Sequence, residues 1–192
     1  EFLDAKINNE TMGIMLFTSG TTAMSKAVML SHKNIVANMM DIDERFGLTC
    51  NDRLLSFLPL HHVFECTVGF LYVVSIGACI CFCEGVKHMA DNLKEFKITA
   101  MVSVPAVYEV MYRKVMRTIE KKGKLPAVQK GIKISQALLK VGIDIRKKIF
   151  SEIHQNLGGE LYLAVAGGAT LDKEVQKGFN NLGITLIQGY GL

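Results

Sequence analysis

The sequence predicts an α/β fold in which a mostly parallel sheet is covered by helices on both faces. Short apolar runs with the length of strands alternate with longer segments whose apolar positions recur at helical spacing. Strands connected by helices pair in parallel, because the crossover helix returns the chain to the same end of the sheet. The chain has 192 residues, of which 49% are hydrophobic and 21% charged. This composition excludes a disordered tail and favours a single globular unit with a substantial core.

The first predicted elements are two strands and a helix. Apolar runs at residues 12–17 and 28–30 have the length and composition of strands. Ser31 has a side chain suited to a helix N-cap, and a helix is expected from there to about Phe46. The hydroxyl-rich loop that begins at Thr18 therefore joins two strands.

The rest of the chain alternates between strands and helices. Further strands are predicted at residues 53–58, 79–83, 100–104, 161–166 and 184–187. Helices are predicted after Pro59 to about 74, at 86–96, from Pro105 through most of the chain to 156, and from 172 to about 182. Loops 59–62, 167–169 and 188–191 each follow a strand. We expect them to meet at the carboxyl edge of the sheet, where ligands bind in such folds.

Residues 66–83 contain no charged side chain and reach the minimum length of a membrane span. The segment Ser75-Ile76-Gly77-Ala78 interrupts this stretch with residues typical of turns. We therefore interpret it as a buried helix followed by a short buried strand, rather than as a transmembrane helix.

The second part of that stretch raises the alternative of a metal site, because Cys79, Cys81 and Cys83 alternate along one predicted strand. Side chains on the same face of a strand are about 6.5–7 Å apart, which is too far for neighbouring thiolates to share a tetrahedral zinc comfortably. No histidine pair completes a ligand set, so core packing is the favoured interpretation. The chain has an odd number of cysteines without framework spacing and no secretory leader at its start, which predicts reduced thiols in a cytoplasmic protein.

Positive charge is concentrated between Arg113 and Lys148, where twelve lysines and arginines face only Glu120 and Asp144. Such a segment can meet a membrane surface, nucleic acid or a polyphosphate. Apolar residues of the same region recur at helical spacing and favour a solvated helix face: Val107, Val110, Met111, Val115 and Ile119. The aromatic residues of single-stranded nucleic-acid grooves are missing, so we predict no nucleic-acid partner. Peripheral contact with a membrane stays a hypothesis for this segment.

The loop from Thr18 to Ala27 has the composition of a phosphate-binding loop. Hydroxyl groups and a glycine allow backbone N–H groups to approach phosphate oxygens, and Lys26 adds a positive charge. A Walker A loop would need glycine before the lysine and Ser or Thr after it, but Ser25 and Ala27 occupy these positions. A Ser/Thr-rich turn between two strands is the other alternative.

Four short motifs, and their order along the chain, resemble those of the adenylate-forming enzymes. This superfamily includes acyl-CoA synthetases, luciferases and the adenylation domains of peptide synthetases. Thr18 to Ala27 is similar to their loop Thr-Ser-Gly-Thr/Ser-Thr-Gly-x-Pro-Lys-Gly, and Pro59 to His62 to their Pro-x-x-His. Gly167 to Ala169 resembles their Gly-Gly-Ala, and Gln188 to Leu192 the start of Gln-Gly-Tyr-Gly-Leu-Thr-Glu. The resemblance covers the whole chain.

Within this superfamily the chain looks most like a long-chain fatty acyl-CoA synthetase. The similarity rests on Val104-Pro105-Ala106-Val107-Tyr108, on the basic helical segment, and on Arg146-Lys147-Lys148-Ile149-Phe150. It implies an ATP-dependent, AMP-forming acid–thiol ligase. A fatty acid or other carboxylate would attack the α-phosphate of ATP to give acyl-AMP and pyrophosphate, and coenzyme A would then take the acyl group. Because two anions meet, oriented donors, a lysine and Mg²⁺ would offset their charge.

The resemblance also implies roles for individual residues. His62 would lie beside the reacting carboxylate and α-phosphate, whereas His61 would be structural. The β- and γ-phosphates would be held by the first loop, that is by Lys26 with Thr18, Ser19, Gly20, Thr21 and Thr22. The adenine would lie against Gly167, Gly168 and Ala169. In the last motif, which starts at Gln188, Tyr190 would stack on the base, and Gly189 and Gly191 would leave room for the acyl chain and the nucleotide. Without the family context, we would interpret His62 as a structural residue at the start of a helix. The glycine pair would then be a tight turn, and Tyr190 a surface residue.

Departures from the family pattern limit what is expected of this chain alone. Ala23, Ser25 and Ala27 replace glycine, proline and glycine. A positive φ at Ala23 would cost about 1 kcal/mol or more, and the loss of proline up to about 1 kcal/mol. The family pattern continues beyond Leu192 with Thr-Glu, the glutamate being the Mg²⁺ ligand, and with a C-terminal domain bearing the adenylation lysine.

We therefore predict that residues 1–192 are an internal fragment of the large N-terminal, AMP-binding domain, inactive by itself. Two alternatives stay open. One is a degenerate nucleotide-binding module without catalysis, and the other is an adenylating enzyme for an aryl acid or a carrier protein.

Overall fold

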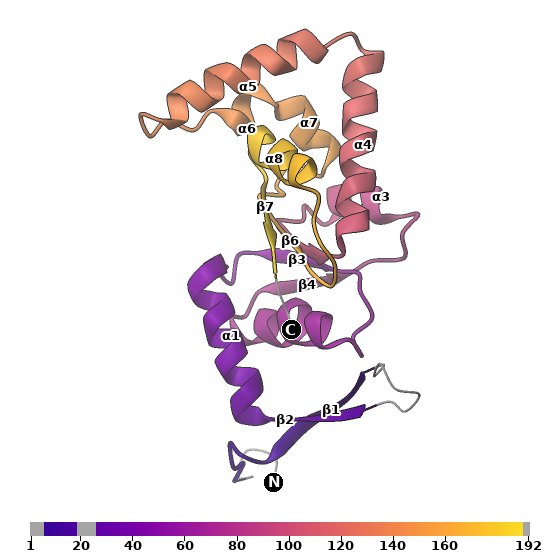
Figure 1. Ribbon diagram of the computed structural model, residues 1–192, viewed down its shortest axis with the longest axis vertical. Coiled ribbons are helices and arrows are strands. Elements are labelled where there is room, and N and C mark those ends of the chain that lie inside the picture. Colours follow the sequence, from indigo (N-terminus) through magenta and orange to yellow (C-terminus); the bar gives the residue numbers. More distant parts are fainter. Residues whose placement is uncertain (1–5, 19–25, 190–192) are drawn as a thin grey trace.

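Five parallel strands form the main sheet of the computed structural model, which describes residues 6–18 and 26–189 (Figure 1). The strands lie in the order β4-β3-β5-β6-β7, and all four neighbouring pairs are parallel. Their bounds are β3 (Arg53–Ser56), β4 (Cys79–Phe82), β5 (Ala100–Ser103), β6 (Leu163–Ala166) and β7 (Thr185–Gln188). The predicted α/β fold class is confirmed.

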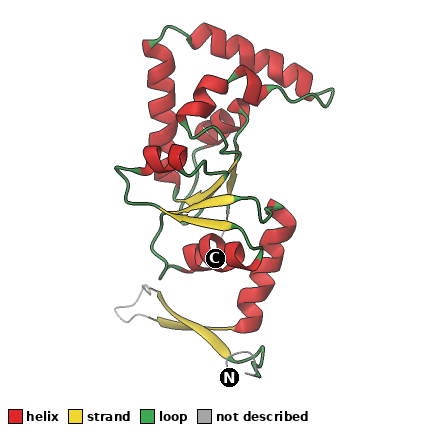
Figure 2. Ribbon diagram, turned by 180° about the vertical axis from the view of Figure 1, so that it is seen from behind, coloured by secondary structure: helices red, strands yellow, loops and turns green. Residues whose placement is uncertain are grey.

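Helices cover both faces of this sheet, as Figure 2 shows from behind. One face carries α1 (His32–Phe46), the π-helix η1 (Glu65–Leu71) and α2 (Tyr72–Ser75). The other face carries α3 (Met89–Glu95), α4 (Pro105–Lys121), α5 (Leu125–Leu139), α6 (Arg146–Ile149), α7 (Ser151–Asn156) and α8 (Lys173–Leu182). Because side chains alternate along a strand, Leu54 packs on the first face and Leu55 on the second.

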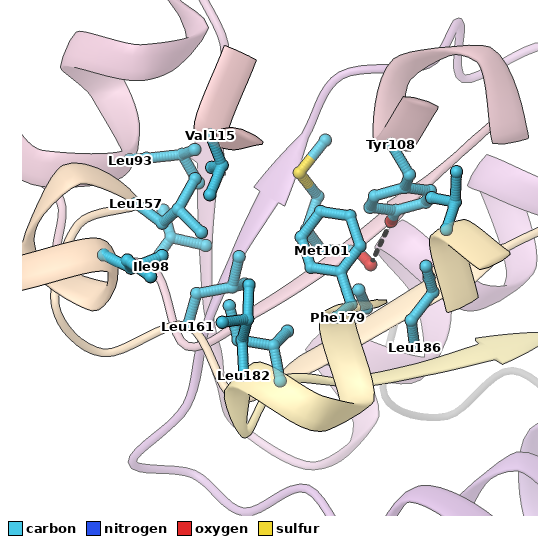
Figure 3. Close-up of a cluster of buried hydrophobic side chains, with 14 of the residues drawn as sticks. Leu93, Ile98, Met101, Tyr108, Val115, Leu157, Leu161, Phe179, Leu182 and Leu186 are labelled. Atoms are coloured by element: carbon cyan, nitrogen blue, oxygen red, sulfur yellow. Dashed lines mark hydrogen bonds between the residues drawn. The ribbon is translucent and has the colours of Figure 1, made fainter. Parts of the chain in front are cut away.

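The larger core lies on the face covered by α3 to α8 (Figure 3). Tyr108 of α4 is fully buried there, and its hydroxyl is within hydrogen-bonding distance of the carbonyl oxygens of Met101 (2.9 Å) and Val165 (3.1 Å). Its ring meets that of Phe179 edge-on, with centroids 6.1 Å apart. These contacts fix α4 and α8 on the sheet.

A separate antiparallel hairpin precedes the sheet. It consists of β1 (Met12–Thr18) and β2 (Lys26–Ser31) and packs mainly against α1 (Figure 1). The Ser31 side chain accepts a hydrogen bond from the N–H of Asn34, whose own side chain accepts from the N–H of Ser31. The predicted strands and N-cap are thus confirmed, and the reciprocal bonds form a capping box.

The cysteine strand differs from the prediction. β4 is the edge strand of the sheet, so it is covered by one neighbour only, and Cys79 and Phe82 are exposed rather than buried. The sulfur atoms of Cys79 and Cys81 are 3.9 Å apart, closer than the expected spacing. Among the described residues, no three histidine, cysteine or acidic side chains are grouped to hold a metal.

Some predicted boundaries also move. The helix expected from residue 86 begins at Met89, and the helix expected after Pro59 begins at Val63 and has π geometry from Glu65 to Leu71. Within residues 6–18 and 26–189, none of the helices combines the length and apolarity needed to cross a membrane.

Candidate functional site

The carboxyl edge of the sheet gathers three of the four predicted motifs. β3, β5, β6 and β7 are consecutive neighbours in the sheet and end at the same edge. The loop that contains His62 follows β3, Gly167 follows β6, and Gly189 follows β7. Parallel pairing therefore brings together loops that are far apart in the sequence.

Phe64 joins these loops, and the sequence did not single it out. A Cβ atom on Gly167 would lie 2.6 Å from its ring, and one on Gly189 would lie 3.6 Å from it. The absent side chain of Gly167 thus makes room for the Phe64 ring, which packs on the core beneath. A glycine that follows a strand predicts a turn, but it does not reveal which side chain will fill the space.

His62 lies at the start of the helical segment that follows β3. Its N–H donates to the carbonyl of Pro59 at 3.0 Å, and its carbonyl accepts from the N–H of Cys66 at 2.9 Å. The imidazoles of His61 and His62 are both exposed, with ring centroids 4.5 Å apart. The backbone is therefore fixed while the His62 ring is accessible to a ligand.

The glycine motif presents open backbone beside this histidine-bearing loop. Gly167 is buried and its N–H donates to the carbonyl of Ser103 at 3.0 Å, whereas Gly168 and Ala169 are exposed. Gly168 has a φ of 79°, a conformation that favours glycine. The Gln188 side chain accepts a 3.3 Å hydrogen bond from the N–H of Leu171 and so ties the loop to β7.

A buried carboxyl group lies beneath the site and was also missed. Glu65 is fully buried, and its Oε1 accepts a 2.6 Å hydrogen bond from the hydroxyl of Ser56 at the end of β3. Among the described residues, neither its Oε2 nor the buried hydroxyl of Ser103 has a hydrogen-bond partner. Burial raises the pKa of Glu65, and the hydrogen bond from Ser56 offsets this only in part.

The glutamate also shapes the helix around it. A Cβ atom on Gly69 would lie 2.6 Å from the Glu65 carboxyl group, so only glycine fits one turn later. Glu65 begins η1, and a π-helical turn in this position agrees with the frequent occurrence of such turns at functional sites. Both the burial and the π geometry depend on tertiary packing, so no signal in the sequence could identify them.

Part of the predicted site lies outside the described residues. This applies to Ser19, Gly20, Thr21 and Thr22 of the phosphate loop, and to Tyr190 and Gly191 of the last motif. At the ends of the loop, Thr18 and Lys26 pair across the hairpin. Lys26 is exposed and forms no ion pair or hydrogen bond with a described side chain.

The described geometry suits a flat, anionic ligand. Exposed backbone at Gly168 and Ala169 can receive a planar ring, and an exposed imidazole can donate a hydrogen bond to an anionic oxygen. No set of metal ligands accompanies them among the described residues. A metal at this edge would need ligands from elsewhere.

Comparisons with known proteins agree with this geometry. The family model described as "AMP-binding enzyme" matches residues 2–192. Long-chain-fatty-acid–CoA ligase 5 of Rattus norvegicus is 31% identical over 96% of the chain, and ligase 1 of Saccharomyces cerevisiae is 31% identical over 93%. The chain spans only 28% and 27% of these two relatives.

Solved structures share the fold at lower identity. The inhibitor-bound N-terminal domain of FACL13 from Mycobacterium tuberculosis has a TM-score of 0.66 and 19% identity, with 95% of this chain and 38% of that one covered. A malonyl-CoA ligase in a complex with methylmalonyl-CoA and AMP has a TM-score of 0.69 and 20% identity, with 96% and 34% covered.

Proposed function

The chain belongs to the AMP-binding enzyme family, and from this membership we propose that it forms the nucleotide-binding core of an ATP-dependent, AMP-forming ligase that joins a long-chain fatty acid to coenzyme A. The long-chain assignment is supported by the relatives from rat and yeast, both of which are named for that activity. We further propose that residues 1–192 are one part of the AMP-binding domain, because they span under a third of those relatives.

One observation carries this proposal. The packing of Phe64 against Gly167 and Gly189 holds the His62 loop, the glycine motif and the end of β7 together at one edge of the sheet. Three of the four motifs that resemble the family are thus neighbours in space, although Phe64 and Gly189 are far apart in the sequence.

The residues have distinct proposed roles. The exposed backbone of Gly168 and Ala169 would receive the adenine of ATP or AMP, with Gln188 and Gly189 beside it and with Tyr190 and Gly191 as proposed further contacts. His62 would donate a hydrogen bond to the oxygens of the carboxylate and α-phosphate, which lowers the repulsion between the two anions.

The phosphates would meet the hairpin. Lys26 would neutralise charge there, together with Thr18 and with Ser19, Gly20, Thr21 and Thr22. When bound, ATP supplies the activated phosphorus at which the carboxylate is adenylated. Mg²⁺ stays a prediction, and its ligands would come from outside the described residues, because these contain no suitable group of three.

The composition of the phosphate loop favours a second candidate function. Ala23, Ser25 and Ala27 depart from the family pattern, which is compatible with a nucleotide-binding module that does not catalyse adenylation. The two functions differ in whether a carboxylate changes the fate of bound ATP.

The decisive experiment is carboxylate-dependent ATP–pyrophosphate exchange by the intact protein with hexadecanoate. We expect exchange, and we expect His62→Ala to lower its rate by about 100-fold because a charge-stabilising donor is lost. His61→Ala is the matched control, since this neighbouring ring is equally exposed, and it should change the rate by less than about threefold.

The possible failures are distinguishable. AMP binding without exchange for any carboxylate would identify the non-catalytic module. Exchange with an aryl or short acid but not with hexadecanoate would keep the ligase and reject the long-chain assignment.

A further inference from the structure

A cavity of about 770 Å³ lies on the face of the sheet that is covered by α3 to α8. Its walls come from α3, α4, α5 and the α6–α7 segment, and its deep residues Leu93, Val115 and Phe150 belong to the larger core. Phe64, in contrast, packs against the smaller core on the other face. The cavity is therefore separated by the sheet from the helix that follows His62.

The lining of the cavity is mostly apolar and elongated. One side of α4 lines it along nearly the whole helix through residues spaced three or four apart: Val107, Val110, Met111, Val115 and Ile119. The rise from Val107 to Ile119 is about 18 Å, which matches an extended long acyl chain. Not all of the apolar residues on this side of α4 are buried in the core, because Val110 is 57% exposed and lines the cavity.

The rim of the cavity is strongly basic. Five lysines line it, namely Lys87, Lys94, Lys114, Lys122 and Lys124, against the single carboxylate of Glu152. Lys122 and Lys124 both contact Glu152, at 2.5 and 2.6 Å. The other three lysines are exposed and form no ion pair with a described residue. The rim thus has positive charge available for an anion.

We propose that this cavity binds one long-chain fatty acid anion at a site separate from the site of adenylation. The acyl chain lies along the apolar side of α4, and the carboxylate meets the free lysines of the rim. The volume is that of a small-molecule site, and an apolar interior with a few charged groups is the usual construction of such sites. A membrane surface fits less well, because these apolar side chains line a hollow instead of projecting from the protein.

The first test is equilibrium binding of radiolabelled hexadecanoate to the intact protein, with and without a saturating non-hydrolysable acyl-adenylate analogue. One equivalent should remain bound when the analogue is present. If the proposed function also holds, a second equivalent is bound without the analogue. If only the proposed function fails, one equivalent of hexadecanoate is bound, and the analogue does not change this amount.

A matched pair of variants locates the site. Ala127 is an exposed residue of α5 that lines the cavity, so Ala127→Phe should fill it and weaken the analogue-resistant binding by about tenfold. Ala137→Phe is the control on the same helix, exposed but outside the cavity, and should change affinity by less than about twofold. Equal behaviour of the two variants would overturn the proposal.

A second pair tests the recognition of charge. Lys114→Glu on the rim should weaken hexadecanoate binding about tenfold, whereas Lys133→Glu on α5 outside the cavity should not, and hexadecanoate methyl ester should bind the wild type weakly. Vesicles of phosphatidylcholine with and without phosphatidylserine provide the competing outcome. Two results together would reject the fatty acid site and show a membrane-binding surface instead. The protein would bind the anionic vesicles only when Lys114 is present, and no hexadecanoate would remain bound in the presence of the analogue.

Discussion

The two edges of the main sheet each hold a buried carboxyl group, and the two groups are treated in opposite ways. Asp52 lies at the amino edge, directly before β3, and Glu65 lies at the carboxyl edge, under the His62 loop. Both are removed from water, but only the aspartate has partners for both of its oxygens.

At the amino edge, both carboxylate oxygens of Asp52 accept hydrogen bonds. Asp52 Oδ2 accepts from the N–H and hydroxyl of Thr49 at 2.8 and 3.2 Å. Its Oδ1 accepts from the hydroxyls of Thr99 at 2.8 Å and Tyr162 at 3.1 Å. Burial acts to raise the pKa of Asp52, but these hydrogen bonds outweigh it and leave the pKa below its usual value. The network ties together the starts of β3, β5 and β6.

The carboxyl edge contains buried polar atoms that lack hydrogen-bond partners among the described residues. Glu65 Oε2 and the hydroxyl of Ser103 are buried without partners in residues 6–18 and 26–189, and the pKa of Glu65 is raised. Unsatisfied buried groups reduce stability, and they persist mainly where a structure serves a ligand or a reaction. The difference agrees with a stabilising role for the amino edge and with the proposal that the carboxyl edge holds the site.

The largest effect should follow from breaking the amino edge. Asp52→Ala leaves several buried donors without an acceptor, and we expect it to lower the free energy of unfolding by about 3 kcal/mol. Urea denaturation of the intact protein measures this loss. Asp91→Ala, at an exposed position of α3, should change it by less than about 0.5 kcal/mol. A similar small effect at Asp52 would show that its network does not stabilise the sheet.

An intermediate effect is expected where Phe64 packs at the carboxyl edge. Gly167→Ala places a methyl group 2.6 Å from the Phe64 ring and should cost about 2 kcal/mol through overpacking, with weaker AMP binding. For stability, Gly189→Ala is the control, because a Cβ atom there would have its nearest contact, Val165, at an ordinary 3.5 Å. AMP titration compares only Gly167→Ala with the wild type, because Gly189 is itself proposed to lie beside the adenine. Urea denaturation and AMP titration report the two effects. An equal change in the free energy of unfolding in the two variants would contradict the role of Phe64 in joining the loops.

The smallest effect concerns Glu65 and depends on pH. Because its pKa is raised in the folded protein, the contribution of Glu65 to stability is fully present below its unfolded pKa of about 4.3 and is lost as pH rises through its folded pKa. Glu65→Gln removes this loss, so the variant should gain about 1 kcal/mol over wild type at neutral pH compared with acid pH. Urea midpoints between pH 4 and pH 8, as an approximate working range, measure this difference.

The control for this prediction is Glu95→Gln, at an exposed position of α3, which should show no such trend. A pH-independent difference between wild type and Glu65→Gln would mean that Glu65 does not titrate differently in the folded state.

Local features of the fold were predictable from the chain. Ser31 and Asp172 have N-cap side chains and do cap α1 and α8, because capping depends on bonds within a few residues. The order of strands and helices was sufficient to predict parallel pairing and a site at the carboxyl edge. The predicted burial of the cysteine strand was wrong, because an apolar run does not tell an edge strand from a central one.

The fold class and the caps followed from the amino-acid sequence, since each depends on local propensity and periodicity, and the loops proposed to hold the site were predicted in the same way. Tertiary packing was needed to place Phe64 in the space at Gly167, to leave Glu65 Oε2 without a partner among the described residues, and to line a cavity with α4. These features arise between residues far apart in the chain. Their energies depend on shape and burial at the contact, which no local pattern of residues encodes.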